Sequence, residues 1–171
     1  MRKKGDWFRW VGPGLLVFFL DRLVKWIHLM VSGELVPALA GFELDFSHPL
    51  GKLLGWFSVP QSTVRNTGMA FGLFQGNTAL ILAISILLLL LCFFLLRRIR
   101  PSGWAPVALS MILGGAAGNM MDRLLRGYVI DMFPFFEWFV FNVADVGVVA
   151  GAILCGWSLL FRPQDWSKEE Q

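Results

Sequence analysis

Histidine, cysteine and charge are scarce in this 171-residue chain, and the missing motifs exclude several classes of chemistry. His28 and His48 are the only histidines, and there is no His-Glu-x-x-His pair to bind zinc. No Gly-x-Ser-x-Gly turn offers a serine nucleophile, and neither Cys92 nor Cys155 has a plausible histidine partner. The Gly-x-Gly-Asp motif of presenilin-like proteases and a phosphate-cradling glycine loop are also missing. We therefore expect no metal and no cofactor.

The sequence contains long apolar blocks and few charged residues. Hydrophobic residues make up 56% of the chain and charged residues 16%, against about 45–50% and about 25% in soluble domains. Four blocks approach the roughly 20 helical residues that cross a hydrocarbon core, at about residues 11–31, 78–96, 104–121 and 139–161. We predict an all-α membrane protein with four transmembrane helices, a single domain over 1–171, and outer loops at about 32–77 and 122–138.

The positions of Lys and Arg predict the orientation, because cytoplasmic loops retain these residues. Nine basic residues lie on the side of the two termini and four on the opposite side, with Arg22 and Lys25 left inside the first span. Both termini are therefore expected in the cytoplasm. The formal charge of +3 reflects this sidedness, and we expect no nucleic-acid binding because no basic stripe is interleaved with base-stacking aromatics.

The long outer loop carries two strand signals. Phe42 to Phe46 alternates apolar and polar residues, and residues 55–64 combine aromatic and β-branched side chains with Pro60 at an edge or bulge. Together they predict a small extracytoplasmic β-sheet. The glycine-punctuated stretch 64–72 could hold an extended peptide or an oxyanion, but by itself it favours a turn that caps the next helix.

Acidic residues stand where charge is costly. Asp21 and Lys25 share one helix face at i and i+4, so they can partly neutralise each other, either as a structural ion pair or as part of a site. Asp131 lies in an aromatic segment that Pro134 prevents from being one continuous helix, and Asp145 opens the last apolar run. Asp131 and Asp145 are therefore expected near one membrane face.

The third and fourth spans carry small residues at helical spacing. Gly114 with Gly118, and Gly147 with Gly151, predict faces for close helix packing. Asn119 and Arg123, at i and i+4 beyond the first pair, could bind substrate or tie loops together.

Two carboxyl groups brought close together cannot easily both ionise, so they share a proton. One then acts as base and the other as acid, which is the aspartic protease arrangement. The apolar surroundings of Asp131 and Asp145 are expected to keep one carboxyl protonated near neutral pH. The spacing does not by itself bring the two acids together. A proton-coupled transporter or channel subunit could use the same acids as a relay, and a non-catalytic scaffold would tolerate their loss.

Five motifs, in order along the chain, resemble those of the lipoprotein signal peptidases, the bacterial signal peptidase II family. They are Asp21 with Lys25; Arg65, Asn66, Gly68, Ala70 and Phe71; Gly114, Gly115, Gly118, Asn119, Asp122 and Arg123; Val129 to Asp131; and Phe141, Asn142, Ala144 and Asp145. Each motif alone is weak, but the ordered set is specific.

The resemblance implies an aspartyl endopeptidase of the bacterial inner membrane that removes the signal peptide from diacylglyceryl-modified prolipoproteins, cutting just before the lipidated cysteine. It implies an active site near the periplasmic face and a sheet-like cradle on the membrane. The partners would be the prolipoprotein and membrane lipids, and we expect a monomer. By the same resemblance Asp131 and Asp145 are the catalytic pair, and the substrate-binding or supporting residues are Asp21, Lys25, Asn66, Gly68, Asn119, Arg123 and Asn142.

Overall fold

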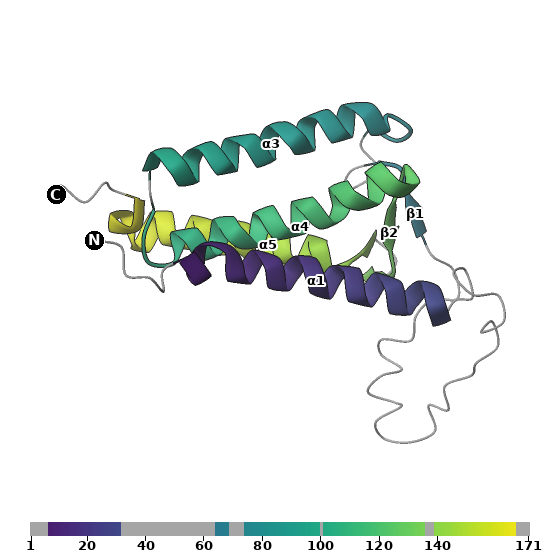
Figure 1. Ribbon diagram of the computed structural model, residues 1–171, viewed down its shortest axis with the longest axis horizontal. Coiled ribbons are helices and arrows are strands. Elements are labelled where there is room, and N and C mark those ends of the chain that lie inside the picture. The colour runs from purple at the N-terminus through teal and green to yellow at the C-terminus, as the bar shows by residue number, and fades with distance from the viewer. Residues whose placement is uncertain (1–6, 32–63, 69–73, 100, 136–138, 167–171) are drawn as a thin grey trace, which may run out of the picture.

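The computed structural model describes residues 7–31, 64–68, 74–99, 101–135 and 139–166. In chain order its elements are α1 (Trp7–Val31), β1 (Val64–Asn66), α3 (Thr78–Ile99), α4 (Ala105–Arg126), β2 (Val129–Asp131), β3 (Phe133–Phe135), β4 (Phe139–Phe141), α5 (Val143–Phe161) and the short 3-10 helix η3 (Pro163–Trp166). The four predicted helices are present. They run in alternating directions, so that α1 begins and α5 ends at the same end of the bundle, with β1 and β2 at the other (Figure 1).

Helix α4 is the centre of the bundle, and glycine allows its neighbours to approach closely. It packs against α1, α5 and α3. A Cβ on Gly114 would collide with the backbone of Gly14 in α1, and one on Gly151 of α5 would lie 2.8 Å from a carbonyl oxygen of α4. Similar close contacts surround Gly118 and Gly147. The predicted packing role of these glycines is confirmed.

The third predicted span was too short at its outer end, because α4 continues to Arg126. Gly127 ends it with a left-handed backbone, at φ 82°, and its N–H donates to the carbonyl of Arg123 at 2.9 Å. Glycine adopts this conformation without the steric cost of a Cβ. The predicted outer loop over 122–138 is therefore helical at its start.

The fourth predicted span began too early. Residues 139–141 form β4, and α5 begins only after Asn142, whose side chain accepts a hydrogen bond from the Asp145 N–H at 2.9 Å. The Asp145 carboxylate accepts in return from the Asn142 N–H at 3.1 Å, which completes a capping box. An apolar Phe-Val-Phe run suits a strand as well as a helix, so only the cap distinguishes them.

Short antiparallel pairs, not one sheet, lie at the end of the bundle where α1 ends and α5 begins. β1 pairs with β2, which sets Val64 opposite Asp131, and β3 pairs with β4, which sets Phe133 opposite Phe141. The strand β1 replaces the start of the turn expected at 64–72. The strand predicted at 42–46 lies outside the described residues. So does the strand predicted at 55–64, except for Val64, which begins β1.

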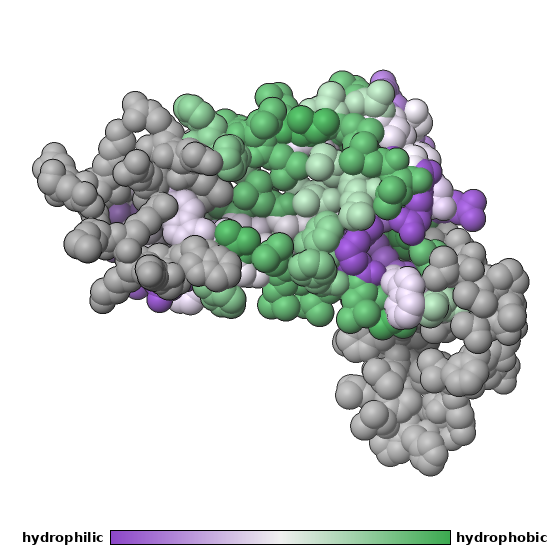
Figure 2. All heavy atoms as spheres, in the orientation of Figure 1, coloured by the Kyte–Doolittle hydropathy of each residue, from purple (hydrophilic) through white to green (hydrophobic). Residues whose placement is uncertain are grey.

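The surface of the helices is largely apolar. Figure 2 shows hydrophobic residues over most of the described face of the bundle, and side chains such as Leu87, Ile153 and Leu160 are 65%, 68% and 77% exposed. Contiguous apolar surface on this scale is typical of contact with lipid or protein. Among the described helices α5 alone is both long and apolar enough to cross a membrane by length and composition, and Thr78–Phe94 forms a shorter apolar segment. The other three spans remain predictions.

Candidate active site

Asp131 is the last residue of β2 and its carboxylate is held by two amides. The Nδ2 group of Asn66, on the neighbouring strand β1, donates to Oδ2 at 2.9 Å. Asn142 Nδ2 donates to Oδ1 at 2.6 Å. The side chain is 2% exposed, so the strand pairing and the two amides together fix the carboxylate in a place that water barely reaches.

Asp145 lies in the first turn of α5 and is held differently. Its Oδ2 atom accepts the N–H of Asn142, and its Oδ1 atom accepts from Nδ2 of Asn119 in α4 at 2.7 Å. A carboxylate in the first turn of a helix is also favoured by the helix dipole. These contacts fix both oxygens of the Asp145 carboxylate at the start of α5.

Two asparagines link the acids. Asn142 Nδ2 donates both to Asp131 and to Oδ1 of Asn119, the second at 3.1 Å. Asn119 Nδ2 in turn donates to Asp145. Each amide therefore points its nitrogen toward a carboxylate, because an ionised carboxylate accepts hydrogen bonds but cannot donate them. This arrangement brings the predicted catalytic pair into one hydrogen-bonded network.

The environment of Asp131 raises its pKa. Burial is the largest cause, and the negative charge of Asp145 adds to it, while the amides of Asn66 and Asn142 and the charge of Lys25 oppose it; the resulting pKa is about 6, against an ordinary 3.8. A carboxyl with this pKa is partly protonated near neutral pH.

A buried ionic cluster supports the site from the α1–α4 interface. Lys25 Nζ lies 3.0 Å from Asp21, 2.7 Å from Asp122 and 3.1 Å from Oδ1 of Asn119, which occupies its three donors. Asp21 Oδ1 accepts from the backbone N–H of Ala144 at 3.0 Å, so the cluster also holds the start of α5. The predicted pairing of Asp21 with Lys25 is confirmed.

Arg123 and Gly68 tie the segment after β1 to α4. Arg123 Nη2 donates to the carbonyl of Gly68 at 2.7 Å, and the N–H of Gly68 donates to Oδ1 of Asn66 at 2.9 Å. The sequence left open whether Arg123 binds substrate or ties loops together, and this contact fits the second role. It also orients Asn66, whose amide nitrogen holds Asp131.

Three members of the ionic cluster were not among the predicted site residues. Arg22 contacts Asp21 at 2.6 Å and Asp122 at 2.7 Å, and Arg126 contacts Asp122 at 3.1 Å. Their signal in the sequence was the presence of ionisable residues within or next to apolar blocks, where each must find a partner. Among the described residues no group of three or more His, Cys, Asp or Glu side chains is placed to hold a metal ion.

Solved structures share the fold of this chain. One solved structure, described as a bacterial membrane enzyme, has a TM-score of 0.55 and 28% identity, covering 64% of this chain and 70% of that one. A second with the same description has a TM-score of 0.61 and covers 88% and 91%; at 22% identity it shows the fold alone. The fold is that of bacterial membrane enzymes.

The sequence comparisons name the family. The family described as Signal peptidase (SPase) II matches residues 14–161. The lipoprotein signal peptidase of Caldanaerobacter subterraneus subsp. tengcongensis is 38% identical, covering 85% of this chain and 92% of that protein. That of Halothermothrix orenii is 33% identical, covering 82% and 87%. The chain belongs to the signal peptidase II family, and is therefore a membrane protease of lipoprotein processing.

Proposed function

We propose that this chain is an aspartic endopeptidase of the bacterial inner membrane that cuts diacylglyceryl-modified prolipoproteins just before the lipidated cysteine. The observation that carries the proposal is that Asn142 binds both acids, Asp131 through its amide and Asp145 through its backbone N–H. A residue that orients two carboxylates at once prepares them to act on one water.

We assign the acid role to Asp131, whose pKa is raised to about 6. Asp145, which accepts hydrogen bonds from Asn119 and from the Asn142 N–H at the start of α5, then acts as the base. Asp145 takes a proton from the water while the water oxygen attacks the scissile carbonyl carbon, and Asp131 gives its proton to the carbonyl oxygen. As the C–N bond breaks, Asp145 passes its proton to the leaving amine and Asp131 recovers one from the diol, so both acids return to their starting states.

The depth of the acids fits a lipid-anchored substrate. Asp145 is the third residue of α5, the helix that is long and apolar enough to span a membrane. Its carboxylate would therefore lie near the membrane boundary. A diacylglyceryl group buried in lipid would hold the neighbouring cysteine at the same level. With the termini in the cytoplasm, this boundary is the periplasmic one, and we propose that a single chain is sufficient.

The test is the separate replacement Asp131→Asn and Asp145→Asn, with cleavage of a diacylglyceryl-modified precursor measured in reconstituted membranes. Each variant should lose cleavage by several orders of magnitude while it remains folded. Asp165→Asn is the matched control, because Asp165 is also a buried acid but lies in η3, and it should retain cleavage.

Two results would overturn the proposal. Full activity in either folded aspartate variant would remove the paired-acid mechanism. Proton or solute flux in liposomes without peptide cleavage would favour the transporter alternative.

A further inference from the structure

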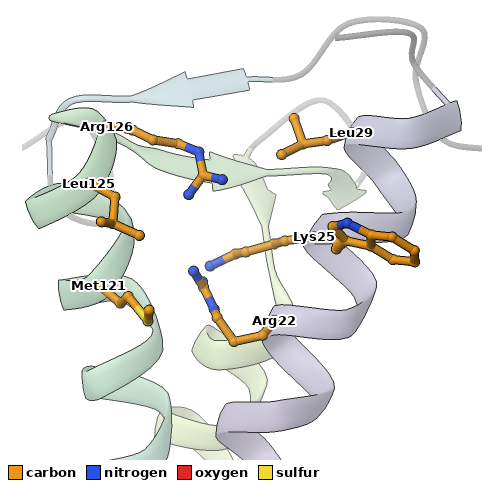
Figure 3. Close-up of a pocket in the computed structure, with 7 residues that line it drawn as sticks. Arg22, Lys25, Leu29, Met121, Leu125 and Arg126 are labelled. Carbon is orange, nitrogen blue, oxygen red and sulfur yellow. The ribbon is translucent and has the colours of Figure 1, made fainter. Parts of the chain in front are cut away.

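The outer ends of α1 and α4 enclose a groove that the proposed cleavage reaction does not use. Its volume is about 200 Å³, and we call it the α1–α4 groove. It is lined by Arg22, Lys25, Trp26 and Leu29 of α1 and by Met121, Leu125 and Arg126 of α4. Figure 3 shows the charged ends of Arg22, Lys25 and Arg126 pointing into the space between the two helices.

The charges around the groove do not balance. Among the residues that the structure describes, the three basic side chains Arg22, Lys25 and Arg126 contact two acids, Asp21 and Asp122. This group of five side chains therefore has one more basic than acidic member. Next to lipid, such an excess is costly unless an anion compensates it.

Arg126 is the cation best placed to receive that anion. Its side chain is 32% exposed, compared with 19% for Arg22 and 3% for Lys25. Within the part of the chain that the structure describes, its recorded contact is the 3.1 Å bond from Nη1 to Asp122. A guanidinium has five N–H donors in a planar fork, and this fork matches the oxygens of a phosphate.

The rim of the groove is apolar and faces outward. Trp26 is 50% exposed, Met121 39% and Leu125 65%. Tryptophan prefers the level of the lipid headgroups, and exposed apolar side chains beside it can contact acyl chains. A soluble anion would not contact such a rim. A lipid matches both features, because its charged head can bind the basic side chains and its apolar tails can contact the rim.

We infer that the α1–α4 groove binds the phosphate of an anionic phospholipid. Arg126 and Arg22 receive the phosphate oxygens, and the acyl chains lie along Leu125 and the neighbouring exposed face of α4. Neither Asp131 nor Asp145 lines the groove, so a lipid there stabilises the ionic cluster without covering the two acids.

The test is native mass spectrometry of the full chain with short-chain phosphatidylglycerol and, in parallel, phosphatidylcholine with the same acyl chains. Phosphatidylglycerol should bind more tightly. Arg126→Gln should reduce that preference by about fivefold, the effect of about one basic residue on binding to an anionic lipid. Arg126→Lys should retain most of it. Arg162→Gln is the matched control, because Arg162 is an exposed cation at the end of α5, and it should leave the preference unchanged.

A second variant tests the groove in case Arg126→Gln does not fold. Leu125→Glu changes an exposed rim residue and should also abolish the preference, because it sets a negative charge beside the phosphate. Equal binding of the two lipids, or an unchanged preference in folded Arg126→Gln, would overturn the inference. Saturation of the groove by inorganic phosphate at the same concentrations would assign it to a soluble anion and would also overturn it.

Discussion

Lys25 of α1 donates a 3.1 Å hydrogen bond to the side-chain oxygen of Asn119 in α4. This bond turns the amide nitrogen of Asn119 toward Asp145, to which it donates at 2.7 Å. A flipped amide would set its oxygen against the carboxylate and its NH₂ against the ammonium, so the cation decides the orientation. The ionic cluster and the paired acids are therefore connected through one side chain.

Replacing Lys25 should destabilise the ionic cluster and impair cleavage by the paired acids. Lys25→Met removes the most buried cation of the cluster and takes away the donor that Asp21, Asp122 and Asn119 share. Breaking a buried ion pair typically costs about 3–5 kcal/mol. We expect a loss of that order in the free energy of unfolding, measured in detergent, together with a lower kcat. The double variant Lys25→Met with Asp21→Asn should recover part of the stability, because it also removes the buried acid. Equal stability of Lys25→Met and the parent protein would contradict this account.

Asn142 offers a way to separate capping from catalysis. Asn142→Ala removes both the helix cap and the amide that binds Asp131, so it should lower the free energy of unfolding by about 1 kcal/mol and abolish most cleavage. Asn142→Ser restores a good capping oxygen without the amide donor. It should recover the stability but not the activity, as measured by thermal unfolding and by precursor cleavage. Recovery of full cleavage in the serine variant would show that capping alone is needed.

The pH dependence of cleavage should report the shared proton. If Asp131 must begin protonated, kcat/KM should decline about tenfold per pH unit above its apparent pKa, which is about 6. Activity should therefore be reduced but measurable at pH 7, in assays with a soluble-lipid precursor over a range of buffers. A profile that stays flat to pH 8 would contradict a single shared proton. An abrupt loss of all activity just above pH 6 would contradict it as well.

Asp131 should also make folding stability depend on pH. Its pKa is raised from 3.8 to about 6 in the folded protein, so the folded state binds the proton more tightly than the unfolded state. The stabilisation is fully present below the unfolded pKa of 3.8 and is lost as pH rises through about 6. The difference between the two pKa values corresponds to about 3 kcal/mol.

Asp131→Asn removes this titration and tests its contribution. Relative to the variant, the parent protein should lose stability between pH 4 and pH 7, measured by unfolding in detergent. Parallel stability curves for the two proteins would show that Asp131 does not titrate in this range.

Glycine contacts between helices give a prediction about packing alone. Gly114→Ala would push a methyl group into the backbone of Gly14, and overpacking of this kind costs about 1–3 kcal/mol. Gly156→Ala is the matched control, because nothing lies within 4 Å of its added Cβ. It should be neutral or stabilising, since alanine favours a helix over glycine by about 1 kcal/mol. Similar unfolding temperatures for both variants would contradict the contact.

Much of the fold was available from local sequence. The apolar blocks predicted all four helices, and the glycine spacing predicted which faces would pack. The ends were less well predicted, although Asn142 with Asp145 and Gly127 carry capping signals that act within a few residues. The apolar run at 139–141 was assigned to the last helix because its composition suits either structure, and its pairing with β3 decided for a strand.

The sequence alone determined that ionisable side chains would be buried among apolar ones and therefore had to find partners. Which partners they found depended on tertiary structure. The contact from Asn66 to Asp131 joins residues 65 positions apart, and it requires β1 to pair with β2. The contacts from Lys25 to Asn119 and from Asn119 to Asp145 require α1 and α5 to lie against α4, which the glycines allow. Local patterns specify helices and caps because their interactions are local. The linkage of Asp131 and Asp145 through Asn142 and Asn119 depends instead on packing between distant segments.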